Sequence, residues 1–424
     1  MTAEMDVTTA RRQLYGPQTE LGVQNFPVRG RTFGDLVPFV RNYARVKLAA
    51  ARVNRASGVL DEARCDAIVT ACQEVIAGEH ADQFPTPLVH GGGGTTANMN
   101  VNEVIAARAS AIGGVEIHPN DHVNASQSTN DTYPTAMALT ILDLVQVPVA
   151  ALRELSAAFA DKAAEFDRTP HLGRTCLQDA VALTAGDTHR GHAAVTSRVA
   201  AGLADAAAAL SSVPIGATAV GTGIGAPDGF GERCAEVLAE LTGRPITSAE
   251  NRYDSLAHLD PYSEIAAAGV RAAIAVAKIA ADFRILSSGP HGGFGDLTIP
   301  AVQAGSSIMP AKVNPVIPEY VMQLSYRVRG QGLAVDCAVA AGELELNVME
   351  PVVLDALTSI FDDVTAAAET FARRCVNGLA WNGAHRERNL TGALDQWVEM
   401  AATEGYETAT GRLLEGPGSG GRTA

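Results

Sequence analysis

Three long stretches without glycine clusters constrain the fold more than any other feature of this sequence. They cover residues 135–166, 189–212 and 261–288, and apolar residues occur round much of the helix that each would form. A helix over residues 262–288 would be about 40 Å long, at ~1.5 Å per residue. Helices with so few polar faces must be buried on most sides. The stretches therefore predict a bundle of long helices within the chain, and association between chains.

The composition points to the same class of fold. Hydrophobic residues make up 47% of the 424 residues, whereas aromatic residues make up only 5%. Alanine is abundant and is the best helix former, while the β-branched and aromatic residues that favour strands do not dominate. Helical spacing of apolar residues over positions 33–77 predicts two or three further helices. We therefore expect an all-α protein with a large core and two or three domains.

The charge and the N-terminus bear on partners and location. The formal net charge of -15 argues against nucleic acid or an anionic membrane as a partner, because both require a basic surface. The sequence has no run of about 18 uninterrupted apolar residues, and residues 1–12 contain acidic residues without an apolar signal core. We expect no nucleic acid partner, no membrane partner and a cytoplasmic location.

The six cysteines are scattered and include no Cys-x-x-Cys pair. This spacing favours reduced, mostly buried thiols over disulfides or a metal site. The cysteines are Cys65, Cys72, Cys176, Cys234, Cys337 and Cys375.

Residues 305–315 combine features that seldom occur together. They read Gly-Ser-Ser-Ile-Met-Pro-Ala-Lys-Val-Asn-Pro. The glycine permits conformations closed to other residues and each proline blocks helix continuation, so the segment is predicted to be a shaped loop between helices. One interpretation is a polar connection. The other is catalysis, because a hydroxyl accepts a proton only if its anion is stabilised, and Lys312 could supply that charge or hold a carboxylate.

Two further segments carry clustered polar groups. Residues 91–94 are four glycines before Thr95 and the start of a predicted helix, so they form either an anion-binding loop with exposed N–H groups or a flexible turn. Residues 126–131 read Ser-Gln-Ser-Thr-Asn-Asp. Their short donors and acceptors could hold a carboxylate, or could cap the helix that follows.

The 305–315 loop closely resembles the characteristic loop of the fumarase/aspartase superfamily, in its fumarase and aspartase branch. Residues 98–104 (Asn-Met-Asn-Val-Asn-Glu-Val), 173–175 (Gly-Arg-Thr) and 343–349 also match motifs of that branch, and the resemblance spans residues 15–360. It implies an all-α, three-domain fold in which long central helices form the core of a homotetramer. The expected parts are an N-terminal helical domain (1–125), a central bundle (126–378) and a small C-terminal domain (379–424) with a disordered glycine-rich tail. Each active site would be assembled from three subunits.

The resemblance also implies roles for individual residues. Ser306 would be the general base, acting as an oxyanion when the loop closes over the substrate. The substrate, a small dicarboxylate, would be bound by Thr95, Ser128, Thr129, Asn130, Thr175, Cys176, Lys312 and Asn314. His118, Asn120 and Asp121 match a second anion site of fumarases, although we favour a hydrogen-bonded surface cluster for them. The sequence shows neither metal-ligand spacing nor a nucleotide-binding fingerprint, so we expect no metal and no cofactor.

The sequence departs from the family pattern at informative positions. Cys176 stands where fumarases and many aspartases have histidine, Gly93 replaces a serine, Gly225 an asparagine and His291 an arginine. Hydroxide is a poor leaving group that benefits from an acid, and a neutral cysteine is a poor one, whereas ammonia needs no proton from the enzyme and nitrite needs one even less. Cys176 therefore favours a carbon–nitrogen lyase that forms fumarate from a 2-substituted succinate, and it does not exclude aspartate as the substrate.

Among such lyases we favour nitrosuccinate lyase. The N–H groups of residues 91–94 suit nitro oxygens, and with Cys176 the pocket lacks an imidazole that could accept from an ammonium. Aspartate ammonia-lyase is the alternative, followed by fumarate hydratase. An inactive structural homologue, like those recruited as lens crystallins, is disfavoured by the intact polar set. A catalytic role of Cys176 is a further alternative, but no histidine is paired with it in sequence.

Overall fold

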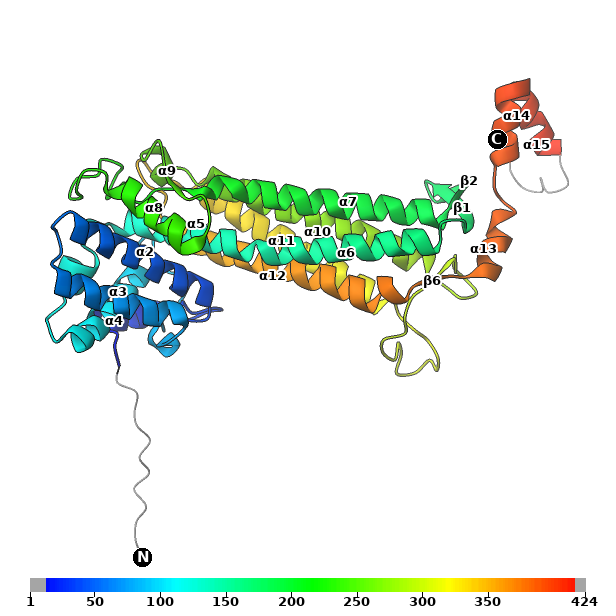
Figure 1. Ribbon diagram of the computed structural model, residues 1–424. Helices are drawn as coiled ribbons and strands as arrows, with labels where there is room; N and C mark the ends of the chain where they lie inside the picture. The colour runs from blue at the N-terminus through cyan, green and yellow to red at the C-terminus, as the bar shows by residue number, and fades with distance from the viewer. Residues whose placement is uncertain (1–12, 416–424) are drawn as a thin grey trace, which may run out of the picture. The chain divides into compact units, whose positions relative to one another are not determined.

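The computed structural model describes residues 13–415, which form an all-α protein with three small two-stranded sheets (Figure 1). This confirms the predicted fold class. The glycine-rich tail expected to be disordered, residues 416–424, lies outside the described residues.

The chain divides into two compact units. The first unit comprises Met1–Val147, Gly202–Val270 and Val328–Asp362, and the second comprises Pro148–Ala201, Arg271–Arg327 and Asp363–Ala424. Each unit thus combines segments that are distant in sequence. The three-part division at residues 125 and 378 stays a prediction.

Five long helices belong in part to both units, and the other α-helices lie within a single unit. The long helices are α6 (Gln146–Glu165), α7 (Ala185–Ala207), α10 (Asp260–Leu286), α11 (Val316–Val339) and α12 (Glu350–Arg374). The first unit also contains α1 (Pro17–Asn25), α2 (Val37–Ala56), α3 (Glu62–Ala77), α4 (Thr95–Gly113), α5 (Thr129–Leu144), α8 (Phe230–Thr242) and α9 (Asp254–Ala257). The second unit contains α13 (Gly383–Leu390), α14 (Asp395–Glu404) and α15 (Tyr406–Glu415). The helices expected over residues 33–77 are α2 and α3, and the long apolar stretches correspond to α5 with α6, to α7 and to α10.

Short turns and strands connect these helices. The single helical turns are η1 (Ala81–Gln83), η2 (Pro119–Val123), η3 (Ala208–Ser211) and η4 (Val376–Gly378). The strands are β1 (Pro170–Thr175), β2 (Gln178–Thr184), β3 (Ser212–Val213), β4 (Thr247–Ser248), β5 (Leu297–Thr298) and β6 (Ala380–Trp381). β1 and β2 form an antiparallel hairpin, β3 pairs with β4 in parallel, and β5 pairs with β6 antiparallel.

The core of the first unit holds α5 against α2. In this unit α2 packs against α3, α5 and α8, and α3 packs against α4 (Figure 1). Phe39 and Tyr43 of α2 are fully buried against Tyr133 of α5, with ring centroids 5.1 and 6.2 Å apart. Edge-on aromatic pairs of this kind add stability beyond the area they bury. The packing therefore fixes α5, whose first turn carries Ser128 and Thr129.

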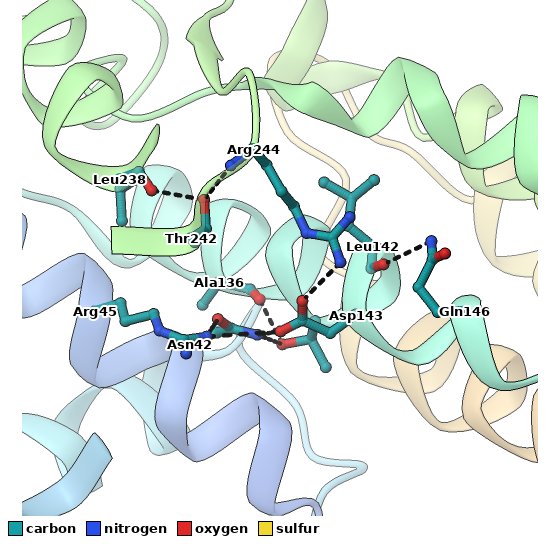
Figure 2. Close-up of polar contacts among 10 residues, drawn as sticks. Asn42, Arg45, Ala136, Leu142, Asp143, Gln146, Leu238, Thr242 and Arg244 are labelled. Carbon is teal, nitrogen blue, oxygen red and sulfur yellow. Dashed lines mark hydrogen bonds and ion pairs between the residues drawn. The ribbon is translucent and has the colours of Figure 1, made fainter. Parts of the chain in front are cut away.

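A polar cluster around Asp143 ties the other end of α5 in place (Figure 2). The Asp143 carboxylate accepts a hydrogen bond from Asn42 Nδ2 at 3.0 Å and forms an ion pair with Arg244 at 3.1 Å. Asn42 lies on α2, and Arg244 follows the C-terminus of α8. Three elements of the first unit are thus joined at one carboxylate, which adds charge-assisted hydrogen bonds to the aromatic packing of α5.

The second unit has a buried cluster of aromatic and histidine side chains. His189 of α7 is fully buried beside Phe159, Phe283 and Trp381, at ring-centroid distances of 6.0–6.3 Å. Its Nε2 accepts a hydrogen bond from Trp381 Nε1 at 3.1 Å, so the neutral ring carries its proton on Nδ1. Burial lowers the pKa of His189 to about 4 and that of the neighbouring His192 to about 3.

We expect His189 to make the protein sensitive to acid. Its folded pKa of about 4 lies below its ordinary value of 6.5, so the unfolded chain takes up this proton first as the pH falls. The stabilisation that neutral His189 gives the folded state is fully present above pH 6.5. It is lost between pH 6.5 and 4, at about 1.4 kcal/mol per pH unit. Urea titrations at pH 7 and 5 measure it, with His189→Gln as the comparison, because glutamine does not titrate but keeps an acceptor for Trp381. An equal pH dependence in both proteins would contradict the assignment.

Two helical stretches are long and apolar enough to cross a membrane by length and composition. They are Thr129–Glu165 and Ala185–Ser211, and 72% of the apolar window of the first is buried within the protein. Such burial is typical of a core helix, whereas 28% of the second window is buried. One or two helices that pass this test are weak evidence for a membrane span. The cytoplasmic location stays a prediction.

All six cysteines are free thiols. Four of them are buried, while Cys176 and Cys337 are exposed. The prediction that most of the thiols are buried is therefore confirmed, and that they are reduced stays a prediction.

Candidate active site

The first turn of α5 presents three of the predicted substrate-binding residues. Ser128 caps the helix, because its Oγ accepts a hydrogen bond from Asn130 N at 3.2 Å and its N–H donates to Asp131 Oδ1 at 3.0 Å. Thr129 Oγ1 accepts a hydrogen bond from Asn98 Nδ2 at 3.0 Å. The capping role and the binding role are compatible, since each hydroxyl that accepts from the protein keeps its own proton to donate. Ser128, Thr129 and Asn130 are all half-buried.

Asp131 attaches this turn to a second loop. Its fully buried carboxylate accepts hydrogen bonds from Gly216 N at 3.1 Å and Thr218 N at 2.9 Å, and Asn130 Nδ2 donates to Ala219 O at 2.8 Å. Burial raises the pKa of Asp131 to about 7, although these N–H groups favour the charged form. Residues 216–219 are thereby held beside the start of α5.

The glycine run before Thr95 is more closely packed than its sequence suggests. Gly91 and Gly92 are exposed, but Gly93 and Gly94 are buried. A Cβ at position 94 would lie 2.1 Å from the Tyr133 ring, and Gly94 has a φ of 89°. Thr95 begins α4 and its Oγ1 donates to Gly92 O at 2.8 Å. Close backbone approach, rather than flexibility, accounts for at least one of these glycines.

Thr175 and Cys176 lie at the tip of the β1–β2 hairpin. Thr175 pairs with Gln178, and the two residues between them, Cys176 and Leu177, have φ values of 53° and 60°. Two consecutive residues with positive φ form the type of turn that suits the twist of a hairpin. Thr175 and Cys176 are exposed at this tip. The expectation that Cys176 lines a substrate pocket stays a prediction.

A buried ion pair anchors the hairpin within the second unit. Arg174 forms an ion pair with Asp296 at 2.6 Å, and their side chains are only 10% and 1% exposed. Asp296 also accepts a hydrogen bond from Asn389 Nδ2 at 2.6 Å. The pair therefore has additional hydrogen bonding, which a buried ion pair requires. It fixes the residue directly before Thr175.

The 305–315 loop is closed by contacts between its two ends. Gly305 N donates to Lys312 O at 3.0 Å, and Asn314 Nδ2 donates to Gly305 O at 2.6 Å. A Cβ at position 305 would lie 2.2 Å from Lys312 O, so only glycine fits there. Lys312 Nζ donates to Asn314 Oδ1 at 2.5 Å. The structure thus places the Lys312 and Asn314 side chains in contact, and their binding of a substrate stays a prediction.

Ser306 lies inside this closed loop in a favourable environment for an oxyanion. Its Oγ accepts hydrogen bonds from Ile308 N at 3.3 Å and Met309 N at 3.0 Å. Backbone N–H groups that point at a hydroxyl oxygen stabilise its deprotonated form, because they interact more strongly with a negative charge. The Ser306 side chain is therefore suited to accept a proton from a substrate.

A pocket of about 600 Å³ lies beside the loop in the second unit. It is lined by the end of the loop, by part of residues 287–301 and by Asn382 and His385. Lys312 and Asn314 belong to its lining. Asn382 and His385 were missed by the sequence analysis, and no motif in the loosely matching C-terminal part could have identified them. Their position makes them candidates for contact with a ligand at Lys312.

The predicted site residues are distributed over both units. Thr95, Ser128, Thr129 and Asn130 belong to the first unit, whereas Thr175, Cys176, Ser306, Lys312 and Asn314 belong to the second. The structure assembles the α5 turn and the 305–315 loop separately. The full set of nine residues as one site stays a prediction.

The residues around His118 form a hydrogen-bonded cluster on the surface. His118 Nδ1 accepts from Asn120 N at 3.3 Å and Asp121 N at 3.2 Å, and His118 N donates to His122 Nδ1 at 2.8 Å. Such local bonds are typical of a helical cap. They agree with the interpretation as a surface cluster, and the second anion site stays untested.

One group in the described part of the chain has suitable atoms for a metal ion. Ligand atoms of Glu74, Glu79 and His80 lie within 4.8 Å of one another. However, Glu74 already accepts two hydrogen bonds from Arg108, at 2.5 and 2.7 Å, and these hold the pKa of its carboxyl at about 2. A cation at this position would compete with a guanidinium, so the donor set fits an ion pair better than a metal.

Comparisons with known proteins match most of this chain. A family described as Lyase matches residues 5–330. The aspartate ammonia-lyase of Corynebacterium glutamicum is 41% identical over 375 residues, which are 87% of this chain and 71% of that protein. The aspartate ammonia-lyase of Escherichia coli K12 is 38% identical over 87% of this chain and 78% of its own length. The class II fumarate hydratase of Thermosynechococcus vestitus is 43% identical over 89% of this chain and 82% of its own length.

Solved structures agree with these relatives. A fumarate lyase:delta crystallin from Brucella melitensis, bound to cobalt, has a TM-score of 0.91 and 38% identity, and the match covers 95% of this chain and 90% of that one. A class II fumarase from Schistosoma mansoni has a TM-score of 0.90 and 32% identity, covering 95% of this chain and 88% of that one. Sequence, fold and loop geometry thus lead to one conclusion: this chain is a lyase of the fumarase/aspartase superfamily.

Proposed function

We propose that this lyase eliminates a nitrogen leaving group from a 2-substituted succinate and forms fumarate, with Ser306 as the general base. The observation that carries the proposal is the pair of backbone N–H groups, from Ile308 and Met309, that donate to Ser306 Oγ. The proton to be removed lies next to a carboxylate and is weakly acidic, so the base must be a stabilised alkoxide. Two fixed donors supply that stabilisation without a change of geometry during the reaction.

In the proposed elimination, residues of the 305–315 loop remove the proton and stabilise the charge that develops. The C3–H bond breaks, its proton passes to the Ser306 oxyanion, and the carboxylate beside C3 takes up the charge as an aci-carboxylate. Lys312 and Asn314 are the donors that we assign to this charge. The electron pair then forms the C2=C3 double bond of fumarate, and the C2–N bond breaks with its electron pair remaining on nitrogen.

We assign Ser128, Thr129 and Asn130 to a carboxylate of the substrate, together with Thr95, Thr175 and Cys176. The proposal includes the homotetramer that the resemblance implies, with each active site shared between copies of the chain. The relatives named aspartate ammonia-lyase and class II fumarate hydratase support a small dicarboxylate as the substrate.

For the leaving group we propose nitrite, released from nitrosuccinate. The support is Cys176, which places a thiol at the exposed hairpin tip where fumarases and many aspartases have an imidazole. Nitrite is the anion of a fairly strong acid and leaves without a proton donor, so loss of the imidazole does not slow its departure. Ammonia from L-aspartate is the second candidate, because two of the relatives described above are aspartate ammonia-lyases.

The test is to incubate the purified protein separately with nitrosuccinate, L-aspartate and L-malate. Fumarate is followed by its ultraviolet absorbance, and nitrite and ammonia are assayed in the same samples. We expect fumarate and nitrite in equal amounts from nitrosuccinate, and little turnover of L-malate. Rapid cleavage of L-aspartate without turnover of nitrosuccinate would assign ammonia as the leaving group and reject nitrite.

A further inference from the structure

A lysine that the proposed mechanism does not use is buried beneath the α5 cap. Lys47 of α2 is fully buried, and its Nζ donates to Asn98 Oδ1 at 2.7 Å, Asn124 Oδ1 at 2.9 Å and Gln127 Oε1 at 3.1 Å. The three N–H groups of the ammonium thus have three amide oxygens as partners. Burial lowers the pKa of Lys47 to about 7, so keeping this ammonium charged costs free energy that burying a methionine of similar length would not. A purely structural position would be better filled by an apolar side chain.

The ammonium fixes the orientation of the Asn98 side chain. Because Asn98 Oδ1 accepts from Lys47, its amide nitrogen must face the other way, where Nδ2 lies 3.2 Å from Asn124 Oδ1 and 3.0 Å from Thr129 Oγ1. A flipped amide would place its NH₂ group against the ammonium, which is electrostatically unfavourable. Lys47 therefore determines that Asn98 donates to Thr129 and does not accept from it.

This direction matters for what Thr129 can do. A threonine hydroxyl has one proton, and since Thr129 Oγ1 accepts from Asn98, that proton is free for an anion. If Asn98 presented its oxygen instead, Thr129 would donate inward and would direct only lone pairs at a carboxylate. The neighbouring Ser128 hydroxyl is oriented in the same sense, because it accepts from Asn130 N.

We propose that Lys47 is a positioning residue for substrate binding, which acts through Asn98 to hold the Thr129 hydroxyl as a donor to a substrate carboxylate. The inference rests on the proposed function of Thr129 and extends it to a residue 82 positions earlier in the sequence. It also predicts that Lys47 affects binding of the substrate more than the chemical step, because Thr129 contacts a carboxylate and takes no part in proton removal.

The test is a double-mutant cycle on KM and kcat, with Lys47→Met, Thr129→Val and the double variant. We expect Lys47→Met to raise KM about tenfold with kcat changed less than threefold, as for a lost charge-assisted interaction. In the Thr129→Val background the same substitution should change KM less than twofold, because no hydroxyl remains to be oriented. Equal effects of Lys47→Met in both backgrounds would overturn the inference.

Two further variants keep the test decisive. Asn98→Leu removes the connecting amide but leaves Lys47, and should reproduce the rise in KM even if Lys47→Met does not fold. Lys162→Met replaces another largely buried lysine, one that is paired with Glu165 in the second unit, and should leave KM unchanged. An unchanged KM in Asn98→Leu would also overturn the inference. If the wild-type protein forms no fumarate from nitrosuccinate or L-aspartate, the proposed function fails and the inference with it, whereas an active wild type with an additive cycle rejects only the role of Lys47.

Discussion

Replacing Ser306 with alanine should lower kcat by about 10³-fold and leave KM nearly unchanged. The magnitude is that of removing a positioned general base, which contributes roughly 10²–10⁴-fold. KM should stay nearly the same because the hydrogen bonds that position the binding donors, Lys312 and Asn314, involve Gly305 and do not involve the Ser306 side chain. Initial rates of fumarate formation, with whichever substrate the wild-type protein uses, measure both constants.

The adjacent hydroxyl provides a matched control for this prediction. Ser307 is exposed, and it is Ser306 Oγ that receives the N–H groups of Ile308 and Met309. Ser307→Ala should therefore keep kcat within about threefold of the wild type, a change of well under 1 kcal/mol in the barrier. The base has been assigned to the wrong residue if Ser306→Ala retains more than a tenth of the activity, or if Ser307→Ala loses as much.

Gly94→Ala should cause a large loss of stability in the first unit. The new Cβ would lie 2.1 Å from Tyr133 Cδ2, and Tyr133 is fully buried against Phe39 and Tyr43, so its ring has nowhere to move. Overpacking of a core typically costs about 1–3 kcal/mol. The φ of 89° adds about 1 kcal/mol for a residue with a Cβ. We expect the free energy of unfolding, measured by urea titration, to fall by about 2–4 kcal/mol.

Gly92→Ala separates the two contributions to this loss. Gly92 has a φ of 86°, close to that of Gly94, but the nearest atoms to its added Cβ are those of Thr95 at 4.0 Å. Its substitution should cost only the backbone contribution, about 1 kcal/mol. The difference between the two variants measures the contact with Tyr133. Similar losses at both positions would show that backbone strain alone explains the requirement for glycine.

Much of the helical fold could be predicted from local pattern. Continuous apolar stretches identified α6, α7 and α10, and helical spacing over residues 33–77 identified α2 and α3. The cap at Ser128 and the loop at residues 305–315 were also predictable, because serine before a helix and closely spaced glycine and proline restrict the backbone over a few residues. The fumarase/aspartase resemblance supplied candidate residues that composition and periodicity could not.

The β1–β2 hairpin is an element that local sequence pattern did not predict. Its turn consists of Cys176 and Leu177, both with positive φ, whereas sequences with asparagine and glycine usually mark such a turn. The hairpin is held instead by distant partners, since Arg174 pairs with Asp296. The contact that holds the hairpin therefore involves a residue some 120 positions away in the sequence, which local pattern does not reveal.

The sequence by itself determined the helices, the capped start of α5 and the glycine- and proline-bounded loop that carries Ser306, because each depends on neighbours within a few residues. Only the tertiary structure decided which polar groups face one another. Lys47 and Asn98 are 51 positions apart, and nothing in either segment indicates that one orients the other. Likewise the Asp131 carboxylate accepts from Gly216 N and Thr218 N, which are 85 and 87 positions away in the sequence. Direction and distance of hydrogen bonds are properties of the folded chain, since they arise from packing between segments that no sequence period connects.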